Sequence, residues 1–253
     1  MAGRGSRFAK EGFKLPKPLI DVRGVPMIQL AMSNLRPNRP HRFVFLCLQD
    51  HLEQYPTEQI LRSIDPNCEI VPVEGVTQGA ACTVLLAKGL IDSDDSLMVV
   101  NSDQWVDLDV NAYLDALSES NADGLIMTMS ADDPKWSFVR MNKEGAILEV
   151  AEKQVISNEA TVGIYNFQHG RDFVAAAEEM IVRDLRVNNE FYLAPAYNIM
   201  IEQGKKIVPF NIGTVGNGMH GLGTPEDLKK FLKNDACEKA LAAVTKPSRT
   251  AAA

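Results

Sequence analysis

The sequence predicts an α/β fold in which a mixed, mostly parallel central sheet is flanked by helices. Short apolar runs alternate with segments of helical spacing through residues 26–130, which is the pattern of successive βα units. Several of these runs are apolar without a break, as strands buried on both faces are. The chain has 253 residues, 45% hydrophobic and 23% charged, which is globular composition.

Apolar spacing predicts where each element lies, and boundary residues predict where it starts or ends. Pro26 is expected at the first position of a helix. Gly204 suits a helix C-cap, and Thr224 suits an N-cap with Pro225 after it. In chain order we expect a helix at 26–35, a strand at 42–48, a helix at 51–64, a strand at 68–73, a helix at 80–91, strands at 96–100 and 124–129 around a helix at 109–117, strands at 136–141, 146–150 and 161–167, helices at 172–184 and 190–203, a strand at 206–210 and a helix from 224.

Charge and composition exclude several classes of function. The net charge of −7 disfavours nucleic acid as a partner. We find no apolar stretch of the roughly 20 residues that would span a membrane and no secretory signal. The four cysteines have no zinc or redox spacing, so we expect buried structural thiols and a cytoplasmic location.

The first residues carry a glycine loop and basic side chains. Gly3 and Gly5 would let backbone N–H groups approach a phosphate. Arg7 follows, and Lys17 stands between two prolines that restrict its backbone. These features suit a triphosphate clamp. A solvated basic segment remains the alternative.

Several short motifs then follow in a fixed order. AGRGSRF at 2–8 is followed by PKP at 16–18, TQGAA at 77–81, VNSD at 100–103, EK at 152–153, VGIY at 162–165 and GTPEDL at 223–228. In this order they resemble the sugar-phosphate nucleotidyltransferases, or nucleoside-diphosphate-sugar pyrophosphorylases, of the glucose-1-phosphate thymidylyltransferase kind. The resemblance covers about residues 1–232 and implies the nucleotide-diphospho-sugar transferase fold, which is GT-A-like and Rossmann-like.

The resemblance also implies a role for each matched position. Arg7 would hold the β- and γ-phosphates, and Lys17 would bridge the α-phosphate and the attacking phosphate, so both are catalytic candidates. Asp103 would bind Mg²⁺, a hard cation that prefers oxygen ligands. The implied nucleotide-binding residues are Ala2, Gly3, Gly5, Ser6, Gln78, Gly79, Ala80 and Ser102. The implied acceptor-binding residues are Glu152, Lys153, Gly163, Asn189 and Glu190.

The implied reaction joins a nucleoside triphosphate, expected to be a pyrimidine, to a sugar 1-phosphate and releases pyrophosphate. Such a product would supply surface polysaccharide synthesis, and the chain could form a homo-oligomer. One alternative is CTP-dependent transfer to phosphocholine or another small phosphomonoester. Others are a GT-A glycosyltransferase that uses DLD at 107–109, and a catalytically dead nucleotide-binding protein.

The chain departs from the family pattern at two places. Family members begin with a strand before the glycine loop, so we expect that the first strand is missing before residue 1. The family's second metal-binding Asp corresponds to Gly221, which leaves His220, Asp107 or Asp227 as helpers of Asp103. We expect one nucleotidyltransferase domain over 1–235, then the end of a helix and a disordered tail over 236–253.

Each candidate also has a structural interpretation. Asp103 could cap a helix, and Asp109 is expected to do so. Glu152 and Lys153 could be a solvated pair at the end of a strand. Gln78 and Gly79 could form only a turn, and Asn189 could cap the helix predicted at 190–203.

Overall fold

The computed structural model describes residues 1–245, and the tail predicted beyond them lies outside these residues. The chain forms two compact units. The first unit comprises Met1–Val76, Asn101–Ala112 and the chain from Val215 onward, and the second unit comprises Thr77–Val100 and Tyr113–Thr214. Each unit is therefore built from segments that are distant in sequence.

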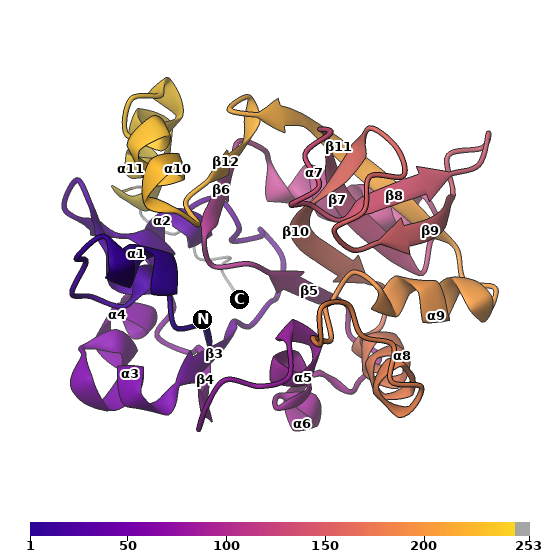
Figure 1. Ribbon diagram of the computed structural model, residues 1–253, viewed down its shortest axis with the longest axis horizontal. Coiled ribbons are helices and arrows are strands. Elements are labelled where there is room, and N and C mark those ends of the chain that lie inside the picture. Colours follow the sequence, from indigo (N-terminus) through magenta and orange to yellow (C-terminus); the bar gives the residue numbers. More distant parts are fainter. Residues whose placement is uncertain (246–253) are drawn as a thin grey trace. The chain divides into compact units, whose positions relative to one another are not determined.

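The first unit consists of short helices around three small strand pairs (Figure 1). Strands β3 and β4 pair in parallel, whereas β1 with β2 and β6 with β12 pair antiparallel. The elements are α1 (Ser6–Lys10), the 3₁₀ turn η1 (Lys17–Leu19), β1 (Asp21–Val22), β2 (Val25–Pro26), α2 (Met27–Met32), β3 (Val44–Leu48), α3 (Gln49–Gln54), α4 (Thr57–Ile64), β4 (Glu69–Val73), β6 (Gln104–Val106), β12 (Gly218–Gly221), α10 (Pro225–Phe231) and α11 (Asp235–Thr245).

One hydrophobic cluster joins the sequence-distant parts of the first unit. Phe8 from α1, Trp105 from β6 and Phe231 from α10 are all at most 2% exposed and belong to it. The Trp105 indole donates a hydrogen bond to Ser33 Oγ over 3.1 Å, so its polar edge is satisfied. This cluster fixes the glycine loop, the segment around residue 103 and the closing GTPEDL motif in one body.

The second unit is a mixed sheet covered by helices. Its elements are α5 (Ala80–Leu85), α6 (Lys88–Ile91), β5 (Leu97–Val100), α7 (Val110–Glu119, which starts in the first unit), β7 (Gly124–Ser130), β8 (Phe138–Met141), β9 (Ile147–Ala151), β10 (Glu159–Phe167), α8 (Gly170–Val182), α9 (Ala196–Glu202) and β11 (Ile207–Val215). β11 pairs with β7 in parallel, whereas β10 pairs antiparallel with β5, β7 and β8. β8 and β9 form an antiparallel hairpin.

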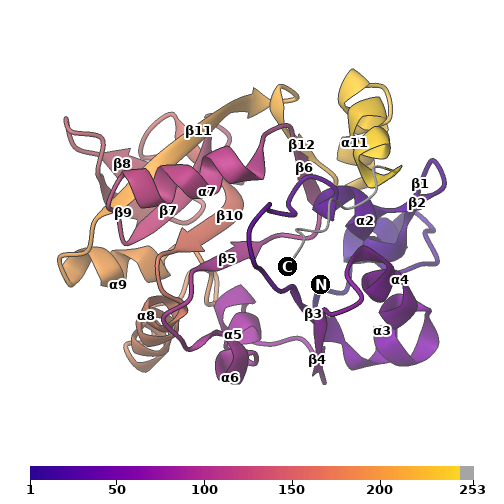
Figure 2. The same ribbon diagram turned by 180° about the vertical axis from the view of Figure 1, so that it is seen from behind.

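Helices cover both faces of this sheet. Helix α7 crosses one face (Figure 2), where Tyr113 donates a hydrogen bond to Leu125 O over 3.0 Å and meets the Phe210 ring edge-on. On the other face Tyr197 of α9 stacks on Phe167 with ring centroids 4.6 Å apart. The eight residues from Ala160 to Phe167 are consequently all buried, including the polar Thr161 and Asn166.

The mixed α/β class expected from the sequence is confirmed, but several helices are shorter than expected. The helix expected at 51–64 divides into α3 and α4 because Pro56 interrupts it, and the helix expected at 80–91 divides into α5 and α6. Helix α2 starts at Met27, so Pro26 is its N-cap and not its first residue. Within residues 1–245, helices are too short or too polar to cross a membrane.

Candidate functional site

Lys17 and Asp103 meet in the first unit although 86 positions separate them. The Lys17 ammonium donates a hydrogen bond to Asp103 Oδ2 over 2.7 Å, and the two side chains are 21% and 27% exposed. Lys17 starts the 3₁₀ turn η1, with Pro16 and Pro18 on either side. Asp103 follows β5 and precedes β6, so it caps no helix and that structural interpretation is wrong.

Two glycines make room for this ion pair. Gly5 has a φ of +59°, and a Cβ there would lie 3.1 Å from Lys17 Cβ, so both conformation and space favour glycine. A Cβ on Gly223 would lie 2.9 Å from Asp103 Oδ2. Leu222 N also donates to Asp103 O over 2.8 Å. The glycine loop and the GTPEDL motif therefore position the pair from two sides.

The rest of the glycine loop is open to solvent. Gly3, Ser6 and Arg7 are exposed, whereas Ala2 is half-buried. Arg7 lies on α1 and has no ion-pair partner within residues 1–245. Ser102 precedes Asp103 and is half-buried in the same unit. This arrangement leaves the guanidinium of Arg7 free of a carboxylate partner in the described part of the chain.

The fit of a metal ion to Asp103 depends on its surroundings. No three His, Cys, Asp or Glu side chains gather at one point within the described residues. His220 is only 6% exposed, packs between Trp105 and Phe231, and has its pKa lowered by burial. Asp107 pairs with Lys239 over 2.6 Å. One carboxylate still fits Mg²⁺, because this ion commonly binds one or two carboxylates together with substrate phosphates.

Asp227 is the third candidate helper of Asp103. Its backbone N–H donates to Thr224 Oγ1 over 3.1 Å, which confirms Thr224 as the N-cap of α10 with Pro225 after it. A Cβ on Gly221 would lie 3.7 Å from Asp227 Oδ2. Asp227 is thus the helper candidate that faces the position where the family carries its second Asp.

In the second unit, Gln78, Gly79 and Ala80 lie at the start of α5. Gly79 is the N-cap with a φ of +136°, and a Cβ there would fall 2.4 Å from Phe191 O. Phe191 N donates to Gln78 O over 2.8 Å, and Ala81 N donates to Phe191 O over 3.0 Å. The turn therefore requires glycine, and it is bonded to a loop more than a hundred residues away in sequence.

Glu152 and Lys153 follow the last residue of β9 in the same unit. Asn198 of α9 holds that strand by accepting from Val150 N and donating to Val150 O, each over 2.8 Å. Ser137 donates a hydrogen bond to Glu152, and burial raises the pKa of the Glu152 carboxyl. Lys153 has a φ of +54°. Glu152 is thus a part-buried, fixed carboxylate and not a solvated one.

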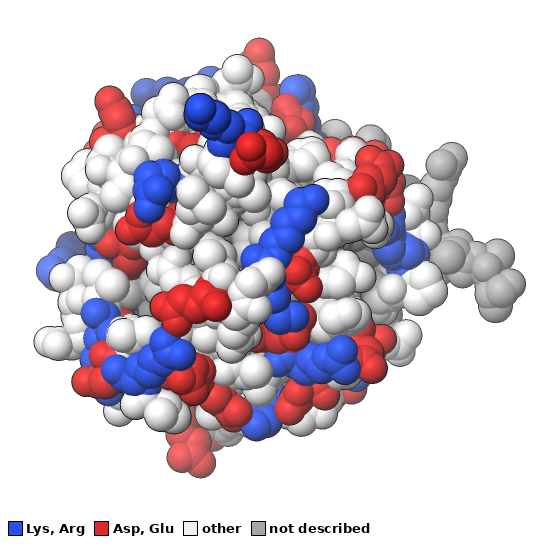
Figure 3. Space-filling model, turned by 90° about the vertical axis from the view of Figure 1, so that its right-hand side faces the viewer, with Lys and Arg blue, Asp and Glu red and all other residues white. Residues whose placement is uncertain are grey.

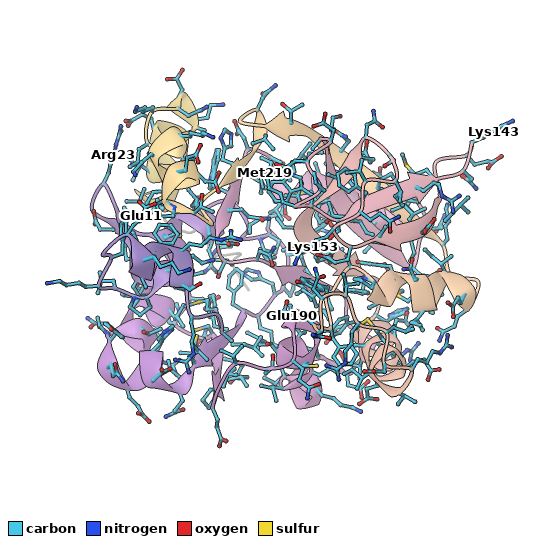
Figure 4. All side chains as sticks on the ribbon, in the orientation of Figure 1. Glu11, Arg23, Lys143, Lys153, Glu190 and Met219 are labelled. Carbon is cyan, nitrogen blue, oxygen red and sulfur yellow. The ribbon has the colours of Figure 1, made fainter. Side chains whose placement is uncertain are left out.

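The Lys153 ammonium lies against Tyr192. It donates a hydrogen bond to the Tyr192 hydroxyl and stands 4.4 Å from the centroid of the ring. The hydrogen bond to the Tyr192 hydroxyl is the largest cause of the raised pKa of Lys153, and the negative charges of Glu152 and Glu190 raise this pKa further. Figure 4 labels Lys153 and Glu190, which come from two different loops of the unit. The structure brings these three predicted acceptor residues into one electrostatic cluster.

The segment around Asn189 corrects one expectation. The helix predicted at 190–203 begins only at Ala196, with Pro195 as its N-cap. Asn188 and Asn189 have φ values of +49° and +63°, so Asn189 caps no helix. Backbone groups of this segment bond across the loop instead, as Val187 N does to Glu190 O over 3.0 Å. Asparagine tolerates this left-handed conformation better than most residues.

Gly163 lies in the middle of β10 with a φ of +90°. The register of β10 against β7 shifts between Thr161 and Tyr165, which is the irregularity that a strand glycine predicts. Asp109 accepts a hydrogen bond from Asn111 N over 2.9 Å and so caps α7, as expected. With Asp107 already paired to Lys239, the 107–109 segment gives the glycosyltransferase alternative little support.

The sequence did not predict the contacts that Glu152 and Lys153 make with Ser137 and Tyr192. Ser137 is 15 positions from Glu152, and Tyr192 is 39 positions from Lys153. No local pattern could pair them, because each contact forms only when separate loops meet. The cysteines also differ slightly from expectation: Cys47, Cys68 and Cys237 are buried, but Cys82 is half-buried.

Comparison with known proteins agrees with these motifs. The sequence model named "Nucleotidyl transferase" matches residues 1–202. The chain belongs to the nucleotidyl transferase family. It is also 25% identical over 172 residues to the bifunctional protein GlmU of Methanococcus aeolicus, a match that covers 66% of this chain and 39% of that protein. The chain thus spans less than half the length of this curated relative.

Solved structures of related proteins share the fold. A nucleoside-diphosphate-sugar pyrophosphorylase from Vibrio cholerae superposes with a TM-score of 0.78 at 25% identity, covering 92% of this chain and 98% of that chain. An inositol-1-phosphate CTP transferase from T. maritima superposes with a TM-score of 0.73 at 16% identity, covering 97% and 94%. The second likeness concerns the fold alone. Both place this chain among nucleotidyl transferase folds.

Proposed function

We propose that this chain catalyses Mg²⁺-dependent nucleotidyl transfer from a nucleoside triphosphate to a sugar 1-phosphate. An oxygen of the acceptor phosphate attacks the α-phosphorus, a new P–O bond forms, the bond to the β-phosphate breaks, and pyrophosphate leaves. The observation that carries the proposal is the 2.7 Å contact between Lys17 and Asp103. It brings together a cation for phosphate oxygens and a carboxylate for a metal, which are the two groups that the resemblance implies.

The residues of the first unit would act on the triphosphate. Arg7 is unpaired by any carboxylate in the described chain, so its guanidinium is available to the β- and γ-phosphates together with the amides from Ala2 to Ser6. Lys17 would align the α-phosphate with the attacking oxygen. Mg²⁺ at Asp103, beside Ser102, would supply neutralisation of negative charge on the phosphates.

The residues of the second unit would select the substrates. Gln78, Gly79 and Ala80 would contact the base. Lys153 would hold the acceptor phosphate, while Glu152 and Gly163 would contact the acceptor's hydroxyl groups. Asn189 and Glu190 would extend that contact from the neighbouring loop. The positive φ of Lys153 supports this assignment, because a non-glycine residue in that conformation is often functional.

A specific observation favours a second acceptor class. The Lys153 ammonium rests 4.4 Å from the Tyr192 ring centroid, in the field of Glu152 and Glu190. An aromatic face beside carboxylates binds cations. A phosphomonoester with a cationic head, such as phosphocholine, would therefore suit Tyr192, Glu152 and Glu190 once its phosphate draws Lys153 away from the ring, with CTP as donor. This remains nucleotidyl transfer with a different acceptor.

Nucleic acid is not the expected substrate in either case. Basic and acidic side chains are intermixed on the face of the described residues shown in Figure 3, and the net charge is −7. A nucleic-acid surface would need a clustered basic patch. We therefore infer that the phosphate-binding charges serve a small ligand.

The test is pyrophosphate release with Mg²⁺, crossing the ribonucleoside triphosphates and dTTP with sugar 1-phosphates, phosphocholine and phosphoethanolamine. We expect release with one donor and one acceptor class. Lys17→Ala should lower kcat/KM by about a hundredfold or more, since the loss of one donor that stabilises transition-state charge typically costs that much. Nucleotide affinity should fall far less. Lys14→Ala, an exposed lysine in the same segment, is the matched control. Equal loss of turnover and affinity in Lys17→Ala would contradict its role.

A further inference from the structure

The amide of Gln78 is held by a second loop of the same unit. Arg186 Nη2 donates a hydrogen bond to Gln78 Oε1 over 2.8 Å. The backbone of Gln78 is fixed as well, because its carbonyl accepts from Phe191 N over 2.8 Å. These two hydrogen bonds set the orientation of both the main chain and the side chain of Gln78.

Arg186 is itself immobilised. Its guanidinium carbon lies 4.1 Å from the centroid of the Phe191 ring. Its Nε donates to Asp184 Oδ1 over 2.5 Å, and its Nη1 donates to Asn189 O over 3.4 Å. A stacked guanidinium with three bonded edges has lost most of its rotamer freedom, so it is a rigid donor.

The chemistry of arginine determines which atom of the Gln78 amide faces it. A guanidinium carries only donors, so its partner has to be the amide oxygen. The amide nitrogen with its two N–H groups then faces away from Arg186. Gln78 is exposed at the start of α5, so those N–H groups are presented to a ligand as donors.

We propose that Arg186 orients Gln78 to donate to the base, and that the chain therefore selects cytidine triphosphate over uridine and thymidine triphosphates. This inference rests on the proposed function, in which Gln78 contacts the base. Cytosine presents adjacent acceptors at O2 and N3, whereas uracil and thymine present O2 and O4 on either side of an N3–H donor. A Gln78 amide that can only donate and that faces N3 therefore bonds cytosine, but in uracil it leaves the N3–H without an acceptor.

The size of the preference follows from the cost of an unpaired polar group. Two opposed donors lose one hydrogen bond and leave both N–H groups unsatisfied, which corresponds to about a ten- to hundredfold weaker affinity. We expect the wild-type chain to bind CTP at least about tenfold more tightly than UTP or dTTP. Isothermal titration with Mg²⁺ and no acceptor measures this ratio. Equal or tighter binding of UTP, dTTP or a purine triphosphate would overturn the inference.

Gln78→Glu tests the donor directly. Glutamate keeps the length of the side chain and its contact with Arg186, but its free oxygen only accepts. The ratio of CTP to UTP affinity should fall about tenfold or more. Repulsion between the new carboxylate and the triphosphate is the same for both nucleotides, so it cancels from this ratio. An unchanged ratio would show that the amide N–H groups do not read the base.

Arg186→Met tests the orienting role. The methionine stem can still cover Phe191, but the donor to Gln78 Oε1 is gone, so the amide can turn either way. We expect the CTP to UTP ratio to fall to within about threefold as UTP binding improves. Arg183→Met is the matched control, because Arg183 pairs with Glu179 and Glu202 and not with the loop. If the affinities for CTP and UTP fell equally, Arg186 would only stabilise the loop and would not orient Gln78.

Failure of this inference is distinguishable from failure of the proposed function. Pyrophosphate release that prefers UTP or dTTP would leave nucleotidyl transfer standing and refute the orientation of Gln78. A chain that binds no nucleoside triphosphate would refute both. Should Arg186→Met not fold, Gln78→Glu still decides whether the amide N–H groups of Gln78 read the base.

Discussion

Gly223 lies where a single methyl group would disturb Asp103. A Cβ at this position would be 2.9 Å from Asp103 Oδ2, closer than van der Waals contact allows. Gly223→Ala should therefore displace the carboxylate from Lys17 and lower kcat/KM by about tenfold or more, since small misplacements are costly in such sites. The free energy of unfolding should change by less than about 1 kcal/mol.

Steady-state kinetics and urea unfolding check this prediction together. Gly89→Ala is the control, because no heavy atom lies within 4 Å of a Cβ at that helical position. Full activity of Gly223→Ala would show that catalysis does not depend on the observed position of the Asp103 carboxylate.

Glu152 predicts a pH dependence of stability at the residue scale. Burial raises the pKa of its carboxyl above 4.5 in the folded chain. The folded state then binds more protons than the unfolded state, so this residue's contribution to stability is full below the unfolded pKa and is lost as pH rises through the folded pKa. Glu152→Gln cannot ionise, so it avoids this loss of stability at higher pH, and its amide oxygen still accepts the hydrogen bond from Ser137.

The stability of Glu152→Gln relative to wild type should therefore be greater at about pH 7 than at about pH 4. Urea unfolding at both values measures the difference. Glu144→Gln, in the exposed hairpin turn, controls for the loss of one negative charge. A difference that is independent of pH, or that shrinks as pH rises, would contradict the effect of burial on Glu152.

At the scale of elements, helix α10 depends on its first residue. Thr224 Oγ1 accepts from Asp227 N over 3.1 Å, and Glu226 and Asp227 lie in the first turn, near the positive end of the helix dipole. Helix α10 places Leu228 and Phe231 in the core that also contains Phe8. Loss of the cap therefore weakens both a helix and the core that supports the glycine loop.

Thr224→Ala should lower the free energy of unfolding by about 1 kcal/mol, the usual value of an N-cap hydrogen bond. Denaturant titration measures it. Thr224→Ser keeps the hydroxyl and should stay within about 0.5 kcal/mol of wild type. Equal losses in the two variants would show that the methyl group, not the cap, stabilises this end of α10.

At the scale of the whole molecule, ligand binding should raise thermal stability. A ligand that binds only the folded state at about a hundred times its Kd contributes about 2.7 kcal/mol, which corresponds to a rise in Tm of about 5–10 °C for a chain of this size. We expect this rise with the preferred triphosphate and Mg²⁺, and a smaller one when EDTA replaces the metal.

Asp103→Asn separates the metal from the nucleotide in the same experiment. The variant should lose the part of the Tm rise that depends on Mg²⁺ and keep the rest, because an amide is a weaker ligand for a hard cation than a carboxylate. Differential scanning calorimetry compares it with wild type. A Tm rise that EDTA leaves unchanged would contradict a metal-dependent nucleotide site.

The sequence by itself determined the local features of this protein. Apolar runs at 42–48 and 96–100 predicted strands, because an unbroken apolar run is typical of a buried strand, and the structure places strands at 44–48 and 97–100. Thr224 predicted a helix start because a hydroxyl satisfies an unpaired N–H. The order of the motifs predicted the family, which the match to residues 1–202 confirms. Each apolar run, cap and motif is itself contained in a few neighbouring residues.

Only the tertiary structure decided the pairings between distant residues. Lys17 meets Asp103 and Lys153 meets Tyr192 across 86 and 39 positions, and no local spacing encodes such contacts. The helix expected from residue 190 gave way to a loop because its backbone bonds to the turn at Gln78. Local propensity amounts to tenths of a kcal/mol per residue, so such long-range bonds and packing override it.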